Sequence, residues 1–590
     1  MNDLNTPDAT HQPAHTGTGH RWRLWAVGAF LIVVLGWAGA SARLLIGAKN
    51  NLQAAQRELQ EVRGSGGLKL LLNGDDKKLK LADAHLYAAA ANLDSPLLSI
   101  AAPLPFLGTQ VRSARALTRA SRQVIGVLLN TSANVSPARR SILTRLELVD
   151  LISDGGRRLE QAINGADLGP RTGLIDSLSH ARATLETQLA AVRTPLARAN
   201  DAMPGIQHIL EGPTHLLLLA ANNAEMGAGS GRPLALTTVD IAKGDIAVGS
   251  FEWSGAIKIP TGSVSLPIDL AQRWAFATPE AGIFRALVTP RFDVTAPLIA
   301  EQYQAATGKS VDGVMLVDVV ALQKMVAVSE AQVSTTTATA DTILSELMNG
   351  QYLTLDDKSD QENIVRQERM GTVARTVLTD LLARHEHVEV AKALVDAMGG
   401  RHVLLWSDKP DMQKTFENAG ADGKIAPNSL TIALQNVGDN KLDWFARVHS
   451  DLTVAPGPNG TRLASVKVTV TCEVPDGQPR YVAGPGVPNL PYGDYQGYLT
   501  IHAPTGSKAL RAVEGPTIAG GVDGGAPTLG QTVSIKRNGS TTATFEFALP
   551  ADLPTMRVES TARYPSVGWT FGAKTWTDDR VETLDLTKAR

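Results

Sequence analysis

The chain has 590 residues and a formal net charge of −2 at pH 7, which argues against a nucleic-acid-binding protein, since such proteins usually carry a basic stripe. Its single cysteine, Cys472, excludes an internal disulfide framework and a multi-cysteine zinc site. The length is ample for several buried cores, and we expect about two to four domains.

Residues 24–42 form the longest apolar run and carry no formal charge. A run of roughly 20 apolar residues is what an α-helix needs to cross the hydrocarbon core of a bilayer. Trp25 and Trp37 lie near its ends, as tryptophans at a membrane interface do. We therefore predict one transmembrane helix over residues 24–46.

The short segment before this helix sets the predicted orientation. Residues 1–23 lack hydrophobic periodicity and are expected to be a disordered tail, which Arg21 and Arg23 favour keeping in the cytoplasm. The helix then acts as a signal anchor, and the bulk of the chain is extracytoplasmic. The alternative is a cleaved signal peptide ending at the small residues 40–42, and it exports the remainder as well.

Residues 47–211 are predicted to form an α-helical stalk or bundle. Leucine, alanine and valine recur at steps of three and four residues from Leu174 to Leu196, which is the spacing of one helix face. Pro195 predicts a kink or break in that helix. Further helical runs are expected at 76–93, 111–129 and 137–163.

Strands and helices alternate over residues 212–427, which predicts an α/β sandwich. The buried strands are expected at 215–221, 312–318 and 403–406, a hairpin with its turn at Lys243 and Gly244 joins 233–239 to 245–251, and helices are expected at 319–328, 388–398 and 410–418. A capping box at Ser359 and Glu362 predicts a further helix that runs to about Arg384.

Residues 428–590 read as β structure and predict a C-terminal β-sandwich. Asn538 and Gly539 stand between two alternating runs, which is a strong hairpin signal. Strict alternation over 466–474 places Cys472 on the apolar face of a strand, so a core position is expected for this thiol.

No nucleotide-binding motif is found. Gly308, Lys309 and Ser310 resemble the end of a P-loop, but Tyr303 stands where the first glycine is required. The triplet also precedes its predicted strand, whereas a P-loop follows one. We therefore expect no phosphate cradle at this position.

A candidate site for an anionic ligand is nevertheless present in the α/β region. Guanidinium groups grip phosphate with two parallel hydrogen bonds, and a carboxylate can hold Mg²⁺ between phosphates. The candidate ligand-binding residues are Arg285, Arg291, Arg366, Arg369, Asn222 and Asn223, with Asp293 and Glu225 as candidate metal ligands. The alternative is that these groups form ordinary ion pairs.

Several segments resemble the bacterial family named domain of unknown function 4012. The resemblance lies in the segments LLLLAANNAE (216–225), TGKSVDGVMLVDVVAL (307–322), VLLWS (403–407) and NVGDNKLD (436–443). It implies a membrane-anchored protein of the cell envelope whose biochemical activity is unassigned.

The middle region more distantly resembles LytR–CpsA–Psr phosphotransferases, which move glycopolymers from a polyprenyl-pyrophosphate carrier to the cell wall. Arg366 and Arg369 match the arginine-bearing helix that ends the core in that family. The family's Arg-Asp pair after the strand at 247–251 is replaced here by the sequence FEWS at 251–254, so the pyrophosphate-gripping arginine is missing.

Three functions are therefore weighed. The leading interpretation is an envelope protein without demonstrable catalysis that binds a lipid-linked or anionic glycopolymer. The second is a glycopolymer phosphotransferase that uses the arginine pair with Mg²⁺. The third is a structural scaffold whose stalk oligomerises in the membrane plane.

Overall fold

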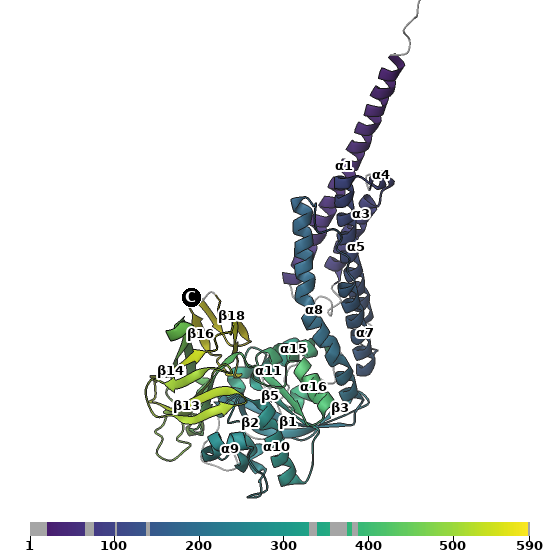
Figure 1. Ribbon diagram of the computed structural model, residues 1–590. Coiled ribbons are helices and arrows are strands. Elements are labelled where there is room, and N and C mark those ends of the chain that lie inside the picture. The colour runs from purple at the N-terminus through teal and green to yellow at the C-terminus, as the bar shows by residue number, and fades with distance from the viewer. Residues whose placement is uncertain are drawn as a thin grey trace, which may run out of the picture. The chain divides into compact units, whose positions relative to one another are not determined.

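The computed structural model describes residues 21–64, 76–100, 103–136, 142–329, 339–353, 375–379 and 387–587, with the side chains of 21–35, 60–64, 329, 387–389, 391 and 459 left out (Figure 1). The chain divides into two compact units. Unit 1 comprises Met1–Asn134 and Arg157–Thr194, and unit 2 comprises Val135–Gly156 and Pro195–Arg590. The predicted tail falls largely on residues 1–20, outside the described part.

Unit 1 is helical, as the sequence predicts. Its helices are α1 (Arg21–Gly64), α3 (Lys77–Leu93), α4 (Pro96–Ser99), α5 (Pro105–Asn134), and parts of α7 (Arg145–Asn164) and α8 (Asp176–Glu211). Small residues let these helices approach closely: Ala55 of α1 and Ala82 of α3 are buried in one cluster with Leu86 and Ile125.

The predicted membrane span lies within α1. Among the helices whose side chains the structure describes, none combines the length and the apolar character that a membrane crossing requires. The transmembrane helix at 24–46 therefore gains no support from the structure and stays a prediction.

Helix α8 continues through Pro195, although this proline predicted a kink or break. The helix ends only at Glu211 and contains Pro204 as well. Because Pro195 is exposed, water can reach the backbone carbonyl that the missing N–H leaves unpaired. The boundary between the two units falls at this proline.

Unit 2 contains a six-stranded mixed sheet. Its strands are β1 (Thr214–Met226), β2 (Gly231–Ala242), β3 (Asp245–Val248), β4 (Glu252–Trp253), β5 (Gly313–Asp318) and β6 (Val403–Ser407). The order is β3-β2-β1-β5-β6, with β4 paired to β2. Strands β1 and β5 are parallel, and the other pairs are antiparallel.

Helices cover both faces of this sheet, which explains the unbroken leucine run of β1. Leu217 and Leu219 pack in the cluster that includes α9 (Ile268–Trp274) and α10 (Phe292–Thr307). Leu216 and Leu218 pack on the opposite face with residues of α11 (Val319–Ser329), α15 (His387–Gly399) and α16 (Pro410–Asn418). The α/β layering is as predicted.

Several short helical segments complete this region. They are η1 (Ser254–Ala256), η2 (Ala275–Ala277), η3 (Pro279–Ala281), η4 (Ile283–Arg285), α12 (Ile343–Ser345), η5 (Glu346–Gly350) and α13 (Gln351–Leu353). The predicted helix from Ser359 to Arg384 falls almost entirely outside the described residues.

The C-terminal part of unit 2 is a β-sandwich of two six-stranded sheets around one core, as predicted. The first sheet has the order β12-β13-β10-β7-β15-β18, and the second β11-β14-β9-β8-β16-β17. Cys472 lies in that core at 0% exposure, on the strand face that its sequence pattern predicts. Asn538 adopts a positive φ of 57° in the predicted hairpin turn, and Lys243 at 54° does so in the other.

The strands of the first sheet are β7 (Ser429–Asn436), β10 (Tyr495–His502), β12 (Ile518–Asp523), β13 (Ala526–Ile535), β15 (Thr555–Glu559) and β18 (Glu582–Asp585). Those of the second are β8 (Ala446–Pro456), β9 (Arg462–Cys472), β11 (Lys508–Ala512), β14 (Gly539–Leu549), β16 (Gly568–Phe571) and β17 (Lys574–Thr577). The connections include η6 (Leu442–Trp444), η7 (Pro458–Gly460) and α17 (Arg480–Ala483).

Candidate functional site

The polar end of strand β1 is buried, and each of its side chains has protein partners. Asn222 donates from Nδ2 to the carbonyl of Leu347 at 3.2 Å and to the hydroxyl of Tyr352 at 3.3 Å. Asn223 donates from Nδ2 to Asp318 and to the carbonyl of Ala562, both at 2.7 Å. These hydrogen bonds of both asparagines are therefore to other groups of this protein.

Glu225 lies between two buried cations. Arg232 donates to its Oε1 at 2.6 Å, and Lys441 donates to its Oε2. Burial disfavours the charged carboxylate, but the two cations outweigh it and hold the pKa of Glu225 below its usual value. Arg232 also donates to Asp439 at 3.0 Å and to the carbonyl of Asn436 at 2.9 Å.

A second buried acid, Asp443, completes the connection between the mixed sheet and the β-sandwich. It accepts hydrogen bonds from the backbone N–H of Met226 at 3.0 Å, from Arg563 at 2.8 Å and from the hydroxyl of Tyr495 at 3.0 Å. The end of β1 is thus fixed by charged groups of the sandwich. This role explains why so polar a segment can be buried.

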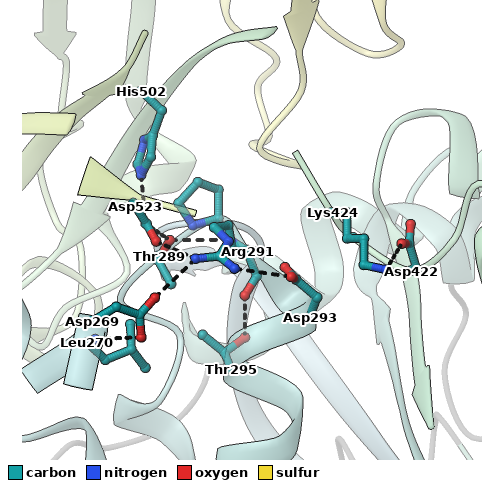
Figure 2. Close-up of polar contacts among 12 residues, drawn as sticks. Asp269, Leu270, Thr289, Arg291, Asp293, Thr295, Asp422, Lys424, His502 and Asp523 are labelled. Atoms are coloured by element: carbon teal, nitrogen blue, oxygen red, sulfur yellow. Dashed lines mark hydrogen bonds and ion pairs between the residues drawn. The ribbon is translucent and has the colours of Figure 1, made fainter. Parts of the chain in front are cut away.

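Arg291 is the centre of a separate charged network, shown in Figure 2. Its Nη1 donates to Asp523 at 2.8 Å and to Asp269 at 3.2 Å, and its Nη2 donates to Asp293 at 3.2 Å. These acids come from three different elements: α9, α10 and the end of β12. The guanidinium that was predicted to grip an anionic ligand is therefore paired with three carboxylates of the protein.

Asp523 is completely buried and well satisfied. Besides Arg291 it accepts hydrogen bonds from Thr289 at 2.6 Å and from His502 at 3.1 Å (Figure 2). It also accepts one from Arg273 at 3.1 Å. Burial opposes its ionisation, but these donors hold its pKa well below the usual value. Asp523 is therefore an ionised structural acid.

Asp293 differs from Asp523 because burial raises its pKa despite the ion pair with Arg291. Among the residues that the structure describes, no group of three histidine, cysteine or acidic side chains is placed to hold a metal ion. Asp293 and Glu225, the two candidate metal ligands, belong to the two separate networks. Nothing brings them to one ion.

The remaining predicted residues lie elsewhere. Arg285 donates to the hydroxyl of Thr278 at 3.0 Å and lies over the ring of Phe284, and these partners differ from those of Arg291. Arg366 and Arg369 fall outside the described residues. Among the predicted ligand and metal residues that the structure describes, Arg291 and Asp293 are the pair joined by a hydrogen bond.

A feature that the sequence analysis missed is an apolar cleft on one face of the mixed sheet. The cleft is small: its cavity volume is about 40 Å³, and the surrounding space, which includes open solvent at its mouth, is about 520 Å³. It lies where the parallel pairing of β1 with β5 ends, beside the carboxyl end of β5, and open α/β sheets commonly bind ligands at the carboxyl ends of their strands. Its lining residues are Leu218, Ala220, Ala221, Ala235, Phe251, Val317, Asp318, Val319, Leu322, Leu347 and Leu378.

The cleft arises because small residues replace large ones midway along β1. Leu216 and Leu218 fill the space above one sheet face, whereas Ala220 follows them on the same face. Ala220 pairs with Ala235 of β2 on one side and with Val317 of β5 on the other. The change from LLLL to AA in the sequence was the available signal.

The only carboxylate in the lining, Asp318, has its oxygens occupied. Its Oδ1 accepts the backbone N–H groups of Val320 and Ala321 at 3.0 Å each, and caps helix α11. Its Oδ2 accepts from Asn223 at 2.7 Å and pairs with His402 at 2.6 Å. The cleft therefore presents an almost entirely hydrocarbon surface.

The fold and the cleft define a multidomain protein in which a mixed α/β sheet with an apolar cleft is joined to a β-sandwich. Residues 211–352 match the family model described as "Protein of unknown function (DUF4012)", which agrees with the resemblance noted in the sequence. The matched segment contains every residue that lines the cleft except Leu378. No curated protein and no solved structure matches the chain, and the resemblance to LytR–CpsA–Psr phosphotransferases is not confirmed.

Proposed function

We propose that this protein is a single-pass, membrane-anchored envelope protein whose α/β region binds the hydrocarbon chain of a lipid-linked glycan. The observation that carries the proposal is the apolar cleft where the parallel pairing of β1 with β5 ends. The apolar run at 24–42 supports the anchor, and an anchored domain meets lipid-linked ligands at the membrane where it is held.

The chemistry of the cleft favours a hydrocarbon over a phosphate or a sugar. Asp318 has no acceptor site left for a ligand, and the other lining side chains are apolar. Each buried methylene contributes about 0.8 kcal/mol to binding, so a few carbon units held by these walls give useful affinity. Since the volume includes the open mouth, the walls hold a segment of a chain.

The described residues lend no support to the phosphotransferase alternative, and its arginine pair, Arg366 and Arg369, lies outside them. Arg291 is held by Asp269, Asp293 and Asp523, and Glu225 is held by two cations. A phosphate would have to displace carboxylates that already complete these pairs. Binding without catalysis is therefore the function that we propose.

The ligand proposal is tested by photo-crosslinking the full chain in vesicles with a polyprenyl phosphate that carries a diazirine near the end of its chain. We expect crosslinked peptides to contain residues 218–221 or 317–322. Unlabelled polyprenyl phosphate should compete, and inorganic phosphate should not. Labelling spread over the surface, without competition, would contradict the proposal.

A cleft-filling variant provides the matched comparison. Ala220→Phe places a large side chain in the cleft and should reduce specific crosslinking several-fold. Ala300→Phe changes a half-buried alanine that packs in the cluster on the opposite face of the sheet, and it should leave crosslinking unchanged. Equal losses in the two variants would indicate general disruption and not a lipid site.

The anchor is tested separately by protease treatment of intact cells. Exposed loops of unit 2 should be cut from outside, and a fragment that contains residues 24–46 should stay with the membrane. If the C-terminal half is untouched while a periplasmic or surface control protein is digested, the extracytoplasmic placement is wrong.

A further inference from the structure

An exposed apolar surface lies where α4 meets α5 in unit 1. We call this surface the tip and define it by five residues: Leu97, Ile100, Leu104, Phe106 and Leu107. Their exposed fractions are 39%, 62%, 42%, 59% and 41%. Soluble surfaces seldom expose so many large apolar side chains within a dozen residues, and such patches usually mark an interaction site.

The tip is also free of charge. From Ser95 to Val111 the sequence contains no Asp, Glu, Lys, Arg or His. Leu98, between the exposed residues, is 1% exposed and anchors the tip in a core with Ala48 and Val111. The apolar residues therefore project from a fixed support.

The tip is hydrogen-bonded to the predicted membrane helix at a defined position along its apolar run. Trp37 of α1 donates a hydrogen bond from Nε1 to the carbonyl of Leu97 at 2.9 Å. Trp37 precedes Ala42, the last residue of the apolar run, by five residues, which is about 8 Å along a helix axis. If the run lies in the bilayer, this contact draws the tip below the membrane surface.

Charged groups begin directly behind the tip. Asp94 pairs with Arg115 at 3.2 Å and with Arg119 at 3.6 Å. Arg112 is the first charged residue of α5 and follows Phe106 by six residues, about 9 Å along the helix. The apolar tip is therefore followed along the helices by arginines. This order matches a bilayer surface, where the acyl chains would surround the tip and the lipid phosphates would lie next to the arginines.

We propose that the tip inserts into the outer surface of the lipid bilayer beside α1 and forms a second membrane contact. The inference rests on the anchor of the proposed function, because the height of the tip is set by its bond to Trp37. The occupant is the acyl-chain region of the lipid. Together the helix and the tip hold unit 1 at two points, which fixes its orientation about α1.

The test is a depth measurement on the full chain reconstituted into phospholipid vesicles. A nitroxide is attached at Phe106→Cys and, in a second protein, at Leu81→Cys. Leu81 is an exposed leucine of α3, 43% accessible, twelve residues before the end of that helix. The native Cys472 is buried and should not be labelled.

We expect the label at position 106 to collide several-fold less often with a water-soluble nickel complex than the label at 81, and more often with oxygen, which concentrates in lipid. Flotation with the vesicles reports the anchor independently. A protein that floats while both labels behave alike would overturn the tip insertion but not the anchor. A protein that does not float would overturn both.

A second copy of the chain is the competing occupant. In that case the label at 106 would be shielded from both reagents, and its spectrum would broaden through spin–spin coupling. That result would overturn the lipid contact. Dilution of labelled protein with unlabelled protein distinguishes lipid insertion from contact with a second copy. Broadening that arises from coupling between copies should decrease on dilution, whereas a lipid-inserted label should give an unchanged spectrum.

Discussion

At the scale of single residues, the α/β region and the sandwich are joined by buried charged residues. Each of these charges would cost free energy if it lost its partner. Glu225 is 8% exposed and pairs with Lys441, which is 2% exposed, and with Arg232, which is 7% exposed and also pairs with Asp439. A buried pair of this kind contributes little net free energy when compared with apolar residues, but removal of one partner leaves a buried charge unpaired. Replacing one residue of the pair should therefore change stability more than replacing both residues with apolar ones.

Glu225→Gln keeps the shape of the side chain and removes its charge. We expect the free energy of unfolding to fall by about 3–5 kcal/mol, because Lys441 then has no carboxylate partner. Chemical denaturation measures the loss, with Glu252→Gln on exposed strand β4 as the control that should change it by less than about 0.5 kcal/mol. A loss restored by adding Lys441→Met would identify the pair, and equal losses in Glu225→Gln and Glu252→Gln would contradict it.

Asp578 predicts a specific dependence on pH. Burial raises its pKa to about 7, while its Oδ1 accepts the N–H of Val567 at 2.8 Å. The folded protein keeps this proton at pH values where the unfolded chain, with a pKa of about 3.9, has lost it. The free energy of unfolding therefore falls by up to roughly 4 kcal/mol as pH rises from about 4 to about 7. Above that range the contribution of Asp578 does not change further.

Asp578→Asn removes the titration and keeps an acceptor for Val567. The difference in unfolding free energy between the variant and the wild type should grow in the variant's favour across that pH interval. Denaturation curves at several pH values measure it. A difference that does not change with pH would show that Asp578 is ionised in the folded protein.

At the scale of elements, the loop between β1 and β2 is unusually constrained. Residues 226–231 are buried, and Ala228 donates to the carbonyl of Leu287 at 2.9 Å. A Cβ atom on Gly229 would lie 2.6 Å from the Cα of Pro290. The glycines there permit contact between two backbones.

Gly229→Ala should lower the free energy of unfolding by about 1–3 kcal/mol, because backbone atoms must move to admit the methyl group. Gly399→Ala is the matched control. It lies at the end of α15 with no atom within 4 Å of the added carbon, and it should be neutral or stabilise by up to about 1 kcal/mol. Thermal unfolding of both variants compares them, and a destabilisation at 399 as large as that at 229 would rule out the steric reason.

The elements that the sequence predicted best are those with strong local signals. Strands β1, β5 and β6 follow from short apolar runs, α16 from Pro410 to Asn418 was expected with the observed bounds, and the turns at 243 and 538 follow from residues that tolerate positive φ. Helix α10 was missed because Pro297 and buried polar residues such as Gln302 obscure its periodicity.

The candidate site was harder to predict because its contacts join distant parts of the chain. Arg291 and Asp523 are 232 residues apart, and Glu225 and Lys441 are 216 apart. The residue types alone fitted two roles equally well: ion pairs within the protein, or groups that bind a ligand. Which role applies depends on partners far away in the sequence, and no local pattern reveals them. The cleft likewise depends on the pairing of Ala220 with Ala235 across two strands.

At the scale of the whole molecule, these networks make the α/β region and the sandwich interdependent. Met226, Glu225 and Asn223 all bond to residues beyond 428. A fragment of residues 135–427 would bury none of these groups properly. We expect it to lack a cooperative unfolding transition, whereas the full chain should protect β1 and β7 together in hydrogen exchange. A fragment with slowly exchanging amides in β1 would contradict this dependence.

The last strands of the chain give the sandwich one more property. Strand β15 lies parallel to β7 and strand β16 lies parallel to β8, so a single late segment completes both sheets. A polypeptide that stopped after Leu549 would leave each sheet with an open edge and its apolar interior uncovered. Only a chain synthesised through these strands can therefore fold completely. Prematurely terminated products should be recognised and degraded by the cell's quality-control proteases.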